Sequence, residues 1–106
     1  MAFPVAASLL DACVLAILKR GETYGYILSQ EMKSLIDVSE STLYPVLRRL
    51  QKSGLLAASD RPFGGRNRRY YAITDAGGAS LQVFIGEWNE YKRNIDRILL
   101  GGSEQA

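Results

Sequence analysis

The chain has 106 residues, of which 47% are apolar and 23% are charged, and its net charge is +2. This length suits one domain with a modest core, and the composition excludes a disordered chain. With no histidine and a single cysteine, Cys13, the sequence argues against a nitrogen–sulfur metal centre, an internal disulfide and histidine-based catalysis.

The N-terminal region carries the longest apolar stretch, but Asp11 and Lys19–Arg20 interrupt it. A membrane helix needs about 20 consecutive apolar residues, so we expect none here. The first residues also lack the basic start and unbroken apolar run of a signal peptide. We therefore expect a cytoplasmic protein that is not an enzyme and that needs no cofactor or metal.

The charges are unevenly distributed along the chain. Residues 41–74 carry seven basic and one acidic side chain, a net charge of +6, whereas residues 1–40 and 75–106 each sum to −2. Such a basic middle segment favours binding to a polyanion. Chance clustering of charges on a solvated surface is the alternative.

Two amphipathic helices are predicted in the first part of the chain. Apolar residues recur at helical spacing from about Ala7 to Arg20, and Gly21 follows as a C-terminal cap. Thr23 is a candidate N-cap for the second helix. The expected inner face of that helix consists of Ile27, Leu28, Met32, Leu35 and Ile36.

A third helix is predicted from residues 41–56, "STLYPVLRRLQKSGLL". Its apolar residues Leu43, Val46, Leu47 and Leu50 follow the i, i+3, i+4, i+7 spacing of one helix face. Ser39 and Ser41 can cap its start, and Gly54 ends it in a left-handed conformation.

Two short extended runs follow, "LLAAS" and "RRYYAIT", around the tip "DRPFGGRN", and they predict a β-hairpin. Within the second run Tyr71 and Ile73 share one face, and Arg68 and Arg69 point to opposite faces. One of Tyr70 and Tyr71 is therefore expected in the core. Thr74 then caps a last helix.

This element order predicts a mainly α fold with a β-hairpin wing: a winged helix-turn-helix followed by a long C-terminal dimerisation helix. We assign residues 1–74 to the DNA-binding domain and residues 75–106 to the dimerisation helix and a short tail.

In a helix-turn-helix, the start of the recognition helix reaches base edges and backbone in the major groove. Exposed hydroxyls and arginines at the start of the third helix and in the hairpin can make such contacts with double-stranded DNA. The alternatives are that the hydroxyls only cap the helix and that the arginines are merely solvated. The predicted DNA-binding residues from this pattern are Ser39, Ser41, Thr42, Tyr44, Arg48, Arg66, Arg68 and Arg69.

The last helix carries an apolar stripe with the 3-4 alternation of a coiled-coil seam. A helix of about 25 residues extends roughly 37 Å, beyond the reach of so small a core. Homodimerisation would cover the stripe and would place two recognition helices on a palindromic site, whereas packing on the first helix is the alternative. The predicted dimerisation residues are Leu81, Phe84, Ile85, Trp88, Tyr91, Ile95 and Ile98.

Small residues on the first helix would let another surface come close. If they face the last helix across a dimer, Trp88 borders a cavity for a flat aromatic ligand. Plain interface packing of this tryptophan is the alternative. The predicted effector pocket consists of Ser8, Ala12, Ala16, Phe84 and Trp88.

Three motifs in this order, "LLDACVLAILKRGETYGYIL", "STLYPVLRRLQKSGLL" and "GG…RRYYAITDAG", resemble the PadR family of bacterial transcriptional regulators. The length is similar to that of its compact subgroup with a single C-terminal helix. The resemblance implies a winged-helix homodimer that represses detoxification or efflux genes and is released by a small molecule. It also implies that Tyr24 faces DNA and that Trp88 lies at a dimer-interface pore.

Two residues depart from the family pattern. Gly78 stands where a larger or basic residue is usual, and Lys92 places a cation one turn beyond Trp88, which disfavours cationic effectors. Two rival functions stay open: a winged helix that binds an acidic protein partner instead of DNA, and a ligand-binding dimer without DNA function.

Overall fold

The computed structural model describes residues 7–101. Three helices come first, interrupted by a two-residue strand: α1 (Ala7–Lys19), β1 (Thr23–Tyr24), α2 (Gly25–Ile36) and α3 (Glu40–Lys52). A hairpin of β2 (Leu56–Phe63) and β3 (Arg66–Ile73) follows, and α4 (Asp75–Leu99) ends the described chain. The predicted order of helices and hairpin is confirmed, and β1 is an additional element.

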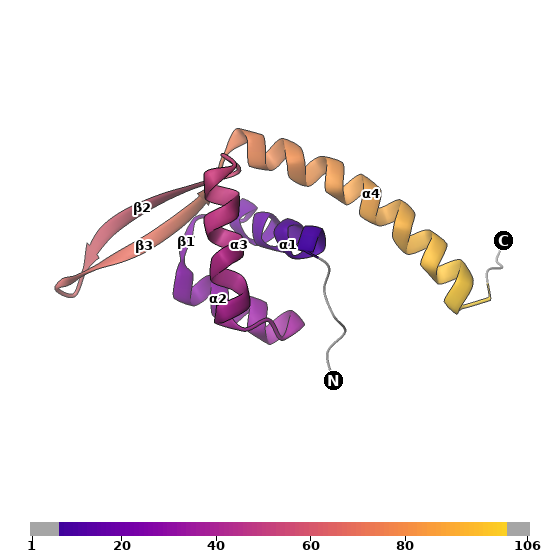
Figure 1. Cartoon of the computed structure of the whole chain (residues 1–106), viewed down its shortest axis with the longest axis horizontal. Coiled ribbons are helices and arrows are strands. Elements are labelled where there is room, and N and C mark those ends of the chain that lie inside the picture. Colours follow the sequence, from indigo (N-terminus) through magenta and orange to yellow (C-terminus); the bar gives the residue numbers. More distant parts are fainter. Residues whose placement is uncertain (1–6, 102–106) are drawn as a thin grey trace.

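The core lies between α1, α2 and α3, which we call the body together with β1 (Figure 1). Leu43, Leu47 and Leu50 of α3 are at most 1% exposed, so the apolar face predicted for this helix is buried. Burial of such side chains from water is the main stabilising contribution in a domain of this size. Other side chains that are at most 2% exposed include Val14, Leu18, Leu28 and Met32.

Two details of α2 differ from the sequence-based expectation. The predicted N-cap, Thr23, lies in strand β1, and the helix starts one residue later, with Tyr24 as its N-cap. The Tyr24 side chain makes no capping hydrogen bond. Ile27 and Leu35 were expected in the core but are exposed, at 40% and 66%. The other elements of the domain therefore cover a narrower face of α2 than the apolar pattern of this helix suggests.

The strands form one antiparallel sheet in the order β1-β3-β2. The hairpin, which we call the wing, pairs from Leu56 with Ile73 to Phe63 with Arg66. Its strands therefore run through the stretch predicted as a loop and close on Gly64 and Gly65, both at positive φ. Tyr71 is buried, as expected for one of the two adjacent tyrosines.

Thr74 connects the wing to α4 and to the end of α3. Its Oγ1 accepts a hydrogen bond from the Gly77 N–H at 3.1 Å and donates one to the Gly54 carbonyl at 2.7 Å. The predicted capping role of Thr74 is confirmed. A Cβ at Gly77 would collide with the Leu55 carbonyl oxygen and lie 2.8 Å from Ile73 Cγ1, so the first turn of α4 packs directly on the α3–β2 connection and on the end of β3.

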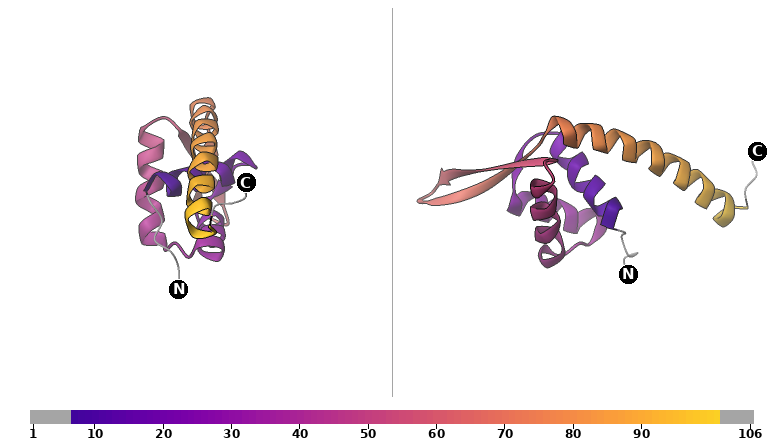
Figure 2. Two further views of the ribbon diagram at one scale, coloured as in Figure 1. Left: turned by 90° about the vertical axis from the view of Figure 1, so that its right-hand side faces the viewer. Right: turned by 45° about the horizontal axis from the view of Figure 1, so that its top comes forward.

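The wing and α4 leave the body on opposite sides, which makes the molecule elongated, with extents of 58 × 32 × 20 Å (Figure 2). α4 has 25 residues, and its first part packs on the core through buried Leu81 and partly buried Phe84. The fold is a winged helix with a projecting C-terminal helix, as the element order predicts.

Candidate nucleic-acid interface

The start of α3 presents a cluster of hydroxyl groups to solvent. Ser39 caps the helix, because its Oγ accepts from the Thr42 N–H at 3.3 Å. The same Oγ lies 3.1 Å from both Ser41 Oγ and Thr42 Oγ1. All three side chains are exposed at the positive end of the helix dipole, where free N–H groups attract phosphate.

Tyr44 lies one turn into α3 and is half-buried beside the start of α2. A Cβ at Gly25 would lie 3.3 Å from its Cε1, so glycine at this position lets the ring approach the α2 backbone. Desolvation, helped by the charge of Glu40, raises the pKa of the Tyr44 hydroxyl. A tyrosine hydroxyl is protonated at neutral pH even at its ordinary pKa, so Tyr44 can donate a hydrogen bond.

A groove of about 470 Å³ lies between the wing, the start of α2 and α3. It brings together four of the predicted DNA-binding residues of the hairpin and helix three, Tyr44, Arg66, Arg68 and Arg69, and also Tyr24. The pattern missed five other lining residues. They are Gly25, Tyr26, Phe63, Asn67 and Tyr71.

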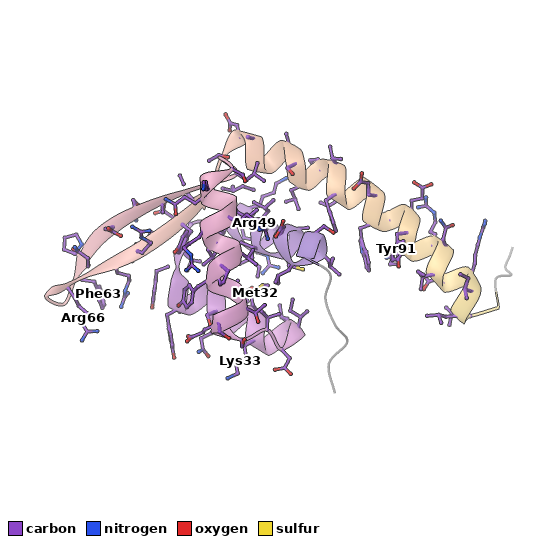
Figure 3. All side chains as sticks on the ribbon, in the orientation of Figure 1. Met32, Lys33, Arg49, Phe63, Arg66 and Tyr91 are labelled. Carbon is purple, nitrogen blue, oxygen red and sulfur yellow. The ribbon has the colours of Figure 1, made fainter. Side chains whose placement is uncertain are left out.

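The wing arginines differ in how the structure holds them. Arg66 lies exposed at the distal end of the wing next to Phe63 (Figure 3). Arg69 Nε donates to Asp60 Oδ1 at 3.1 Å, which partly neutralises its charge. Arg68 lies between two aromatic rings, with its Cζ 3.5 Å from the Phe63 centroid and 3.9 Å from that of Tyr24.

The two arginines of α3 point in different directions. Arg48 is exposed and carries no ion pair among those found in residues 7–101, which leaves its guanidinium accessible. Arg49 makes two hydrogen bonds to the Asp11 carboxylate of α1, at 2.7 and 2.8 Å. Arg49 therefore links α3 to α1, and we exclude it from the candidate DNA surface.

A second groove, of about 390 Å³, lies between the start of α1 and α4. Three of the five residues predicted for the effector pocket, Ser8, Phe84 and Trp88, line this groove within one chain. Ala12 and Ala16 do not, because Ala12 is buried in the core and Ala16 packs against it. The sequence pattern missed Leu9, Glu87 and Tyr91, and Lys92 is not among the lining residues.

The predicted dimerisation stripe changes its environment along α4. Leu81 is buried in the body and Phe84 is partly buried against it, so these two residues also serve the fold of one chain. Ile95 is half-buried. The exposed members are Ile85, Trp88, Tyr91 and Ile98, at 39%, 37%, 61% and 75%.

Two kinds of feature are absent from the described residues. No group of three or more His, Cys, Asp or Glu side chains between residues 7 and 101 could hold a metal ion. In the same part of the chain, no helix combines the length and the apolar character that membrane crossing requires.

The chain resembles proteins of known family. A sequence model described as the transcriptional regulator PadR-like family matches residues 14–83. Transcriptional regulator Rv3488 of Mycobacterium tuberculosis is 46% identical over 86 residues, which cover 80% of this chain and 77% of that protein.

Solved structures agree with this assignment. The crystal structure of smu.1704 from Streptococcus mutans has a TM-score of 0.87 and 40% identity, with full coverage of both chains. A PadR family transcription regulator from Clostridium difficile has a TM-score of 0.78 and 25% identity, over 85% of this chain and 97% of that one.

The winged-helix fold, the match across residues 14–83 and these relatives confirm the resemblance found in the sequence motifs. Members of this family bind DNA to regulate transcription and are not enzymes. The chain belongs to the PadR-like family of transcriptional regulators.

Proposed function

We propose that the chain is a homodimeric repressor that acts in the cytoplasm and binds a palindromic operator through α3 and the wing. The observation that carries this proposal is the shared groove, in which Tyr44 of α3 and the wing arginines border one space. A single duplex lying along this groove would meet side chains from the helix and phosphate-binding charges from the wing.

We assign different roles to the residues of this surface. Ser41, Thr42, Tyr44 and Arg48 approach base edges and nearby phosphates, whereas Ser39 mainly orders the helix start through its cap. Arg66 and Arg68 contact the backbone. Arg69 contributes less, because Asp60 compensates its charge.

The exposed apolar stripe supports a dimer through α4. Tyr91 and Ile98 are 61% and 75% exposed in one chain, and burial of such side chains against a second copy would stabilise association. In a two-fold dimer, the two α3 helices could each bind one half-site of the operator, with the half-sites separated by about one duplex turn.

Selection of bound sequences from a random duplex pool tests the operator proposal. We expect an inverted repeat whose half-sites are about 10 base pairs apart, centre to centre. Recovery of unrelated sequences, or of a single half-site, would contradict a dimer that binds DNA through two α3 helices.

A double substitution tests the wing. Arg66→Ala with Arg68→Ala should weaken binding to all duplexes and flatten the dependence of log K on log salt by about one unit for each lost phosphate contact. Arg93→Ala with Arg97→Ala removes the same charge from α4 and serves as the control. Equal salt slopes for the two double variants would show that the wing makes no phosphate contacts.

We further propose that the second groove binds a small planar aromatic effector. Binding between the α4 helices of a dimer would change the distance between its two DNA-binding domains. The walls of the groove include Phe84, Trp88 and Tyr91, with the Glu87 carboxylate at its edge. A carboxylate in this position favours a cation over an anion, in contrast to the expectation based on Lys92.

Fluorescence of Trp88, the single tryptophan, reports on this groove directly. Proflavine, a planar cation, should quench the emission at lower concentration than 1-naphthoate, a planar anion. Glu87→Gln should remove the difference between the two compounds. Absence of saturable quenching by either would argue that Trp88 only packs against the second chain.

A further inference from the structure

A row of stacked side chains crosses the outer face of the sheet. The Tyr24 and Tyr70 rings lie with centroids 5.6 Å apart and an interplanar angle of 59°. Arg68 covers Tyr24 on one side of this pair, and Arg61 covers Tyr70 on the other with its Cζ 4.3 Å from the centroid. The complete stacked row consists of Phe63, Arg68, Tyr24, Tyr70 and Arg61.

The register explains why these residues meet. Arg61 pairs with Arg68 and Phe63 with Arg66, so these residues lie on one face of the wing. Tyr71 lies on the opposite face and is buried in the core, whereas Asn67 and Arg69 further along that face are exposed. The stacked row therefore adds nothing to the core and lies where solvent and ligands reach it.

Tyr24 is the member of the row that belongs to the body. It is the N-cap of α2 and pairs with Tyr70 through the short β1 strand. The β1–β3 ladder contains two residue pairs, Thr23 with Tyr71 and Tyr24 with Tyr70. Beyond this ladder the wing projects away from the body (Figures 1 and 2).

Arg68 extends this connection toward the tip. Its guanidinium contacts the body through the Tyr24 ring and the end of β2 through the Phe63 ring. Cations are attracted to aromatic faces at these distances, and a planar guanidinium also stacks on them. On the other side of the row, Arg61 makes a 2.6 Å ion pair with Glu22, which immediately precedes β1.

We propose that Tyr24 is a positioning residue that acts on DNA through Arg68. Its ring holds the Arg68 guanidinium and thereby sets the angle of the wing to α3, so that the wing and Tyr44 reach the same duplex. This inference rests on the proposed DNA-binding function. It assigns the contribution of Tyr24 to its ring and not to its hydroxyl.

Two substitutions at Tyr24 separate ring from hydroxyl. Tyr24→Phe keeps the stack and should bind the selected duplex within about twofold of the unmodified protein. Tyr24→Leu removes the ring and should weaken binding about five- to tenfold, with a flatter salt dependence like that of Arg68→Ala. Tyr26→Leu removes a neighbouring ring that lies outside the row, and it serves as the matched control for hydrogen exchange of the free protein and not for DNA binding, because Tyr26 lines the groove.

A double-mutant cycle tests whether Tyr24 acts through Arg68. If it does, adding Tyr24→Leu to Arg68→Ala should cost little further affinity, because coupled residues have non-additive effects. Fully additive losses would overturn the proposal. A loss with Tyr24→Phe equal to that with Tyr24→Leu would also overturn it, because the hydroxyl would then contact DNA directly.

Amide hydrogen exchange of the free protein tests the positioning without DNA. Tyr24→Leu should speed exchange in the outer wing, residues 60–68, while Tyr24→Phe and Tyr26→Leu leave it unchanged. Phe63→Leu removes the other ring that contacts Arg68, from an exposed site, so it tests the outer end of the row without risk to the core. Unchanged exchange in both Tyr24→Leu and Phe63→Leu would overturn the proposal. Failure of the unmodified protein to bind duplex DNA would instead overturn the proposed function, and the exchange measurement would still test the role of Tyr24 in positioning the wing.

Discussion

The body and the outer half of α4 handle their apolar side chains in opposite ways. In the body, α1, α2 and α3 pack together so closely that the side chains of Val14, Leu28 and Leu43 have no exposed surface. In the outer half of α4, Tyr91 and Ile98 remain mostly exposed on a helix of the same chain. One chain therefore completes the core of the winged helix but leaves the apolar side chains of outer α4 exposed, and we propose that a second copy covers them.

The largest expected effect comes from charging the α4 stripe. Ile95→Asp with Ile98→Asp would bury two unpaired carboxylates in a dimer, at a cost of about 3 kcal/mol or more for each. We expect a monomer at micromolar concentration with an intact body, measured by sedimentation equilibrium and circular dichroism.

The matched control places the same charges on the opposite face of α4. Gly86 and Asn89 are both exposed, and a Cβ at Gly86 meets nothing within 4 Å. Gly86→Asp with Asn89→Asp should therefore leave the oligomeric state unchanged. If both double variants stay dimeric, the stripe is not the dimer interface.

The joint between the two regions is tested by a pair of neighbouring glycines. Gly77→Ala places a methyl group against the Leu55 carbonyl and Ile73, which should lower the free energy of unfolding by about 1–3 kcal/mol. Gly78→Ala meets no atom within 4 Å and should raise it by about 0.5–1 kcal/mol, because alanine favours a helix interior. Urea unfolding measures both, and equal effects would mean that α4 does not pack on the body as described.

Loss of the Thr74 hydroxyl gives a smaller effect at the same joint. Thr74→Ala removes the cap of α4 and the bond to the Gly54 carbonyl, which should cost about 1–2 kcal/mol in thermal unfolding. Thr74→Ser keeps the hydroxyl and should recover most of this stability. A serine variant as unstable as the alanine variant would assign the effect to packing of the methyl group.

The smallest effect concerns the ion pair at the base of the wing. A hydrogen bond from Arg61 lowers the pKa of Glu22 below its ordinary value of 4.5, although burial opposes this slightly. A lowered pKa in the folded state contributes stability that is present above pH 4.5 and is lost as the pH falls through the folded pKa. Arg61→Gln should therefore melt slightly below the unmodified protein at pH 7 and level with it at pH 3. A difference that persists at pH 3 would come from the lost contact with Tyr70.

Local sequence patterns predicted the parts of this molecule that depend on neighbours along the chain. The apolar face of α3, the Ser39 and Thr74 caps and the 25-residue α4 follow from spacing and capping chemistry within a few residues. These features are set by interactions that a sequence displays directly.

Features that depend on distant residues could not be predicted in this way. Asp11 and Arg49 are 38 positions apart, and the pairing that brings Tyr24 beside Tyr70 involves a strand of two residues. The exposure of Leu35 depends on how little of α2 the other helices cover. The sequence alone predicts that Arg68 and Arg69 lie on opposite faces of the strand. The aromatic partners of Arg68 could be identified only from the register of the strands.

Sedimentation equilibrium of the full chain, alone and with a selected duplex, tests the central claim most directly. We expect a free protein with twice the 11.7 kDa mass of one chain, and a complex that contains two chains on each duplex. A well-folded protein of 11.7 kDa that binds duplex one chain at a time would contradict this expectation.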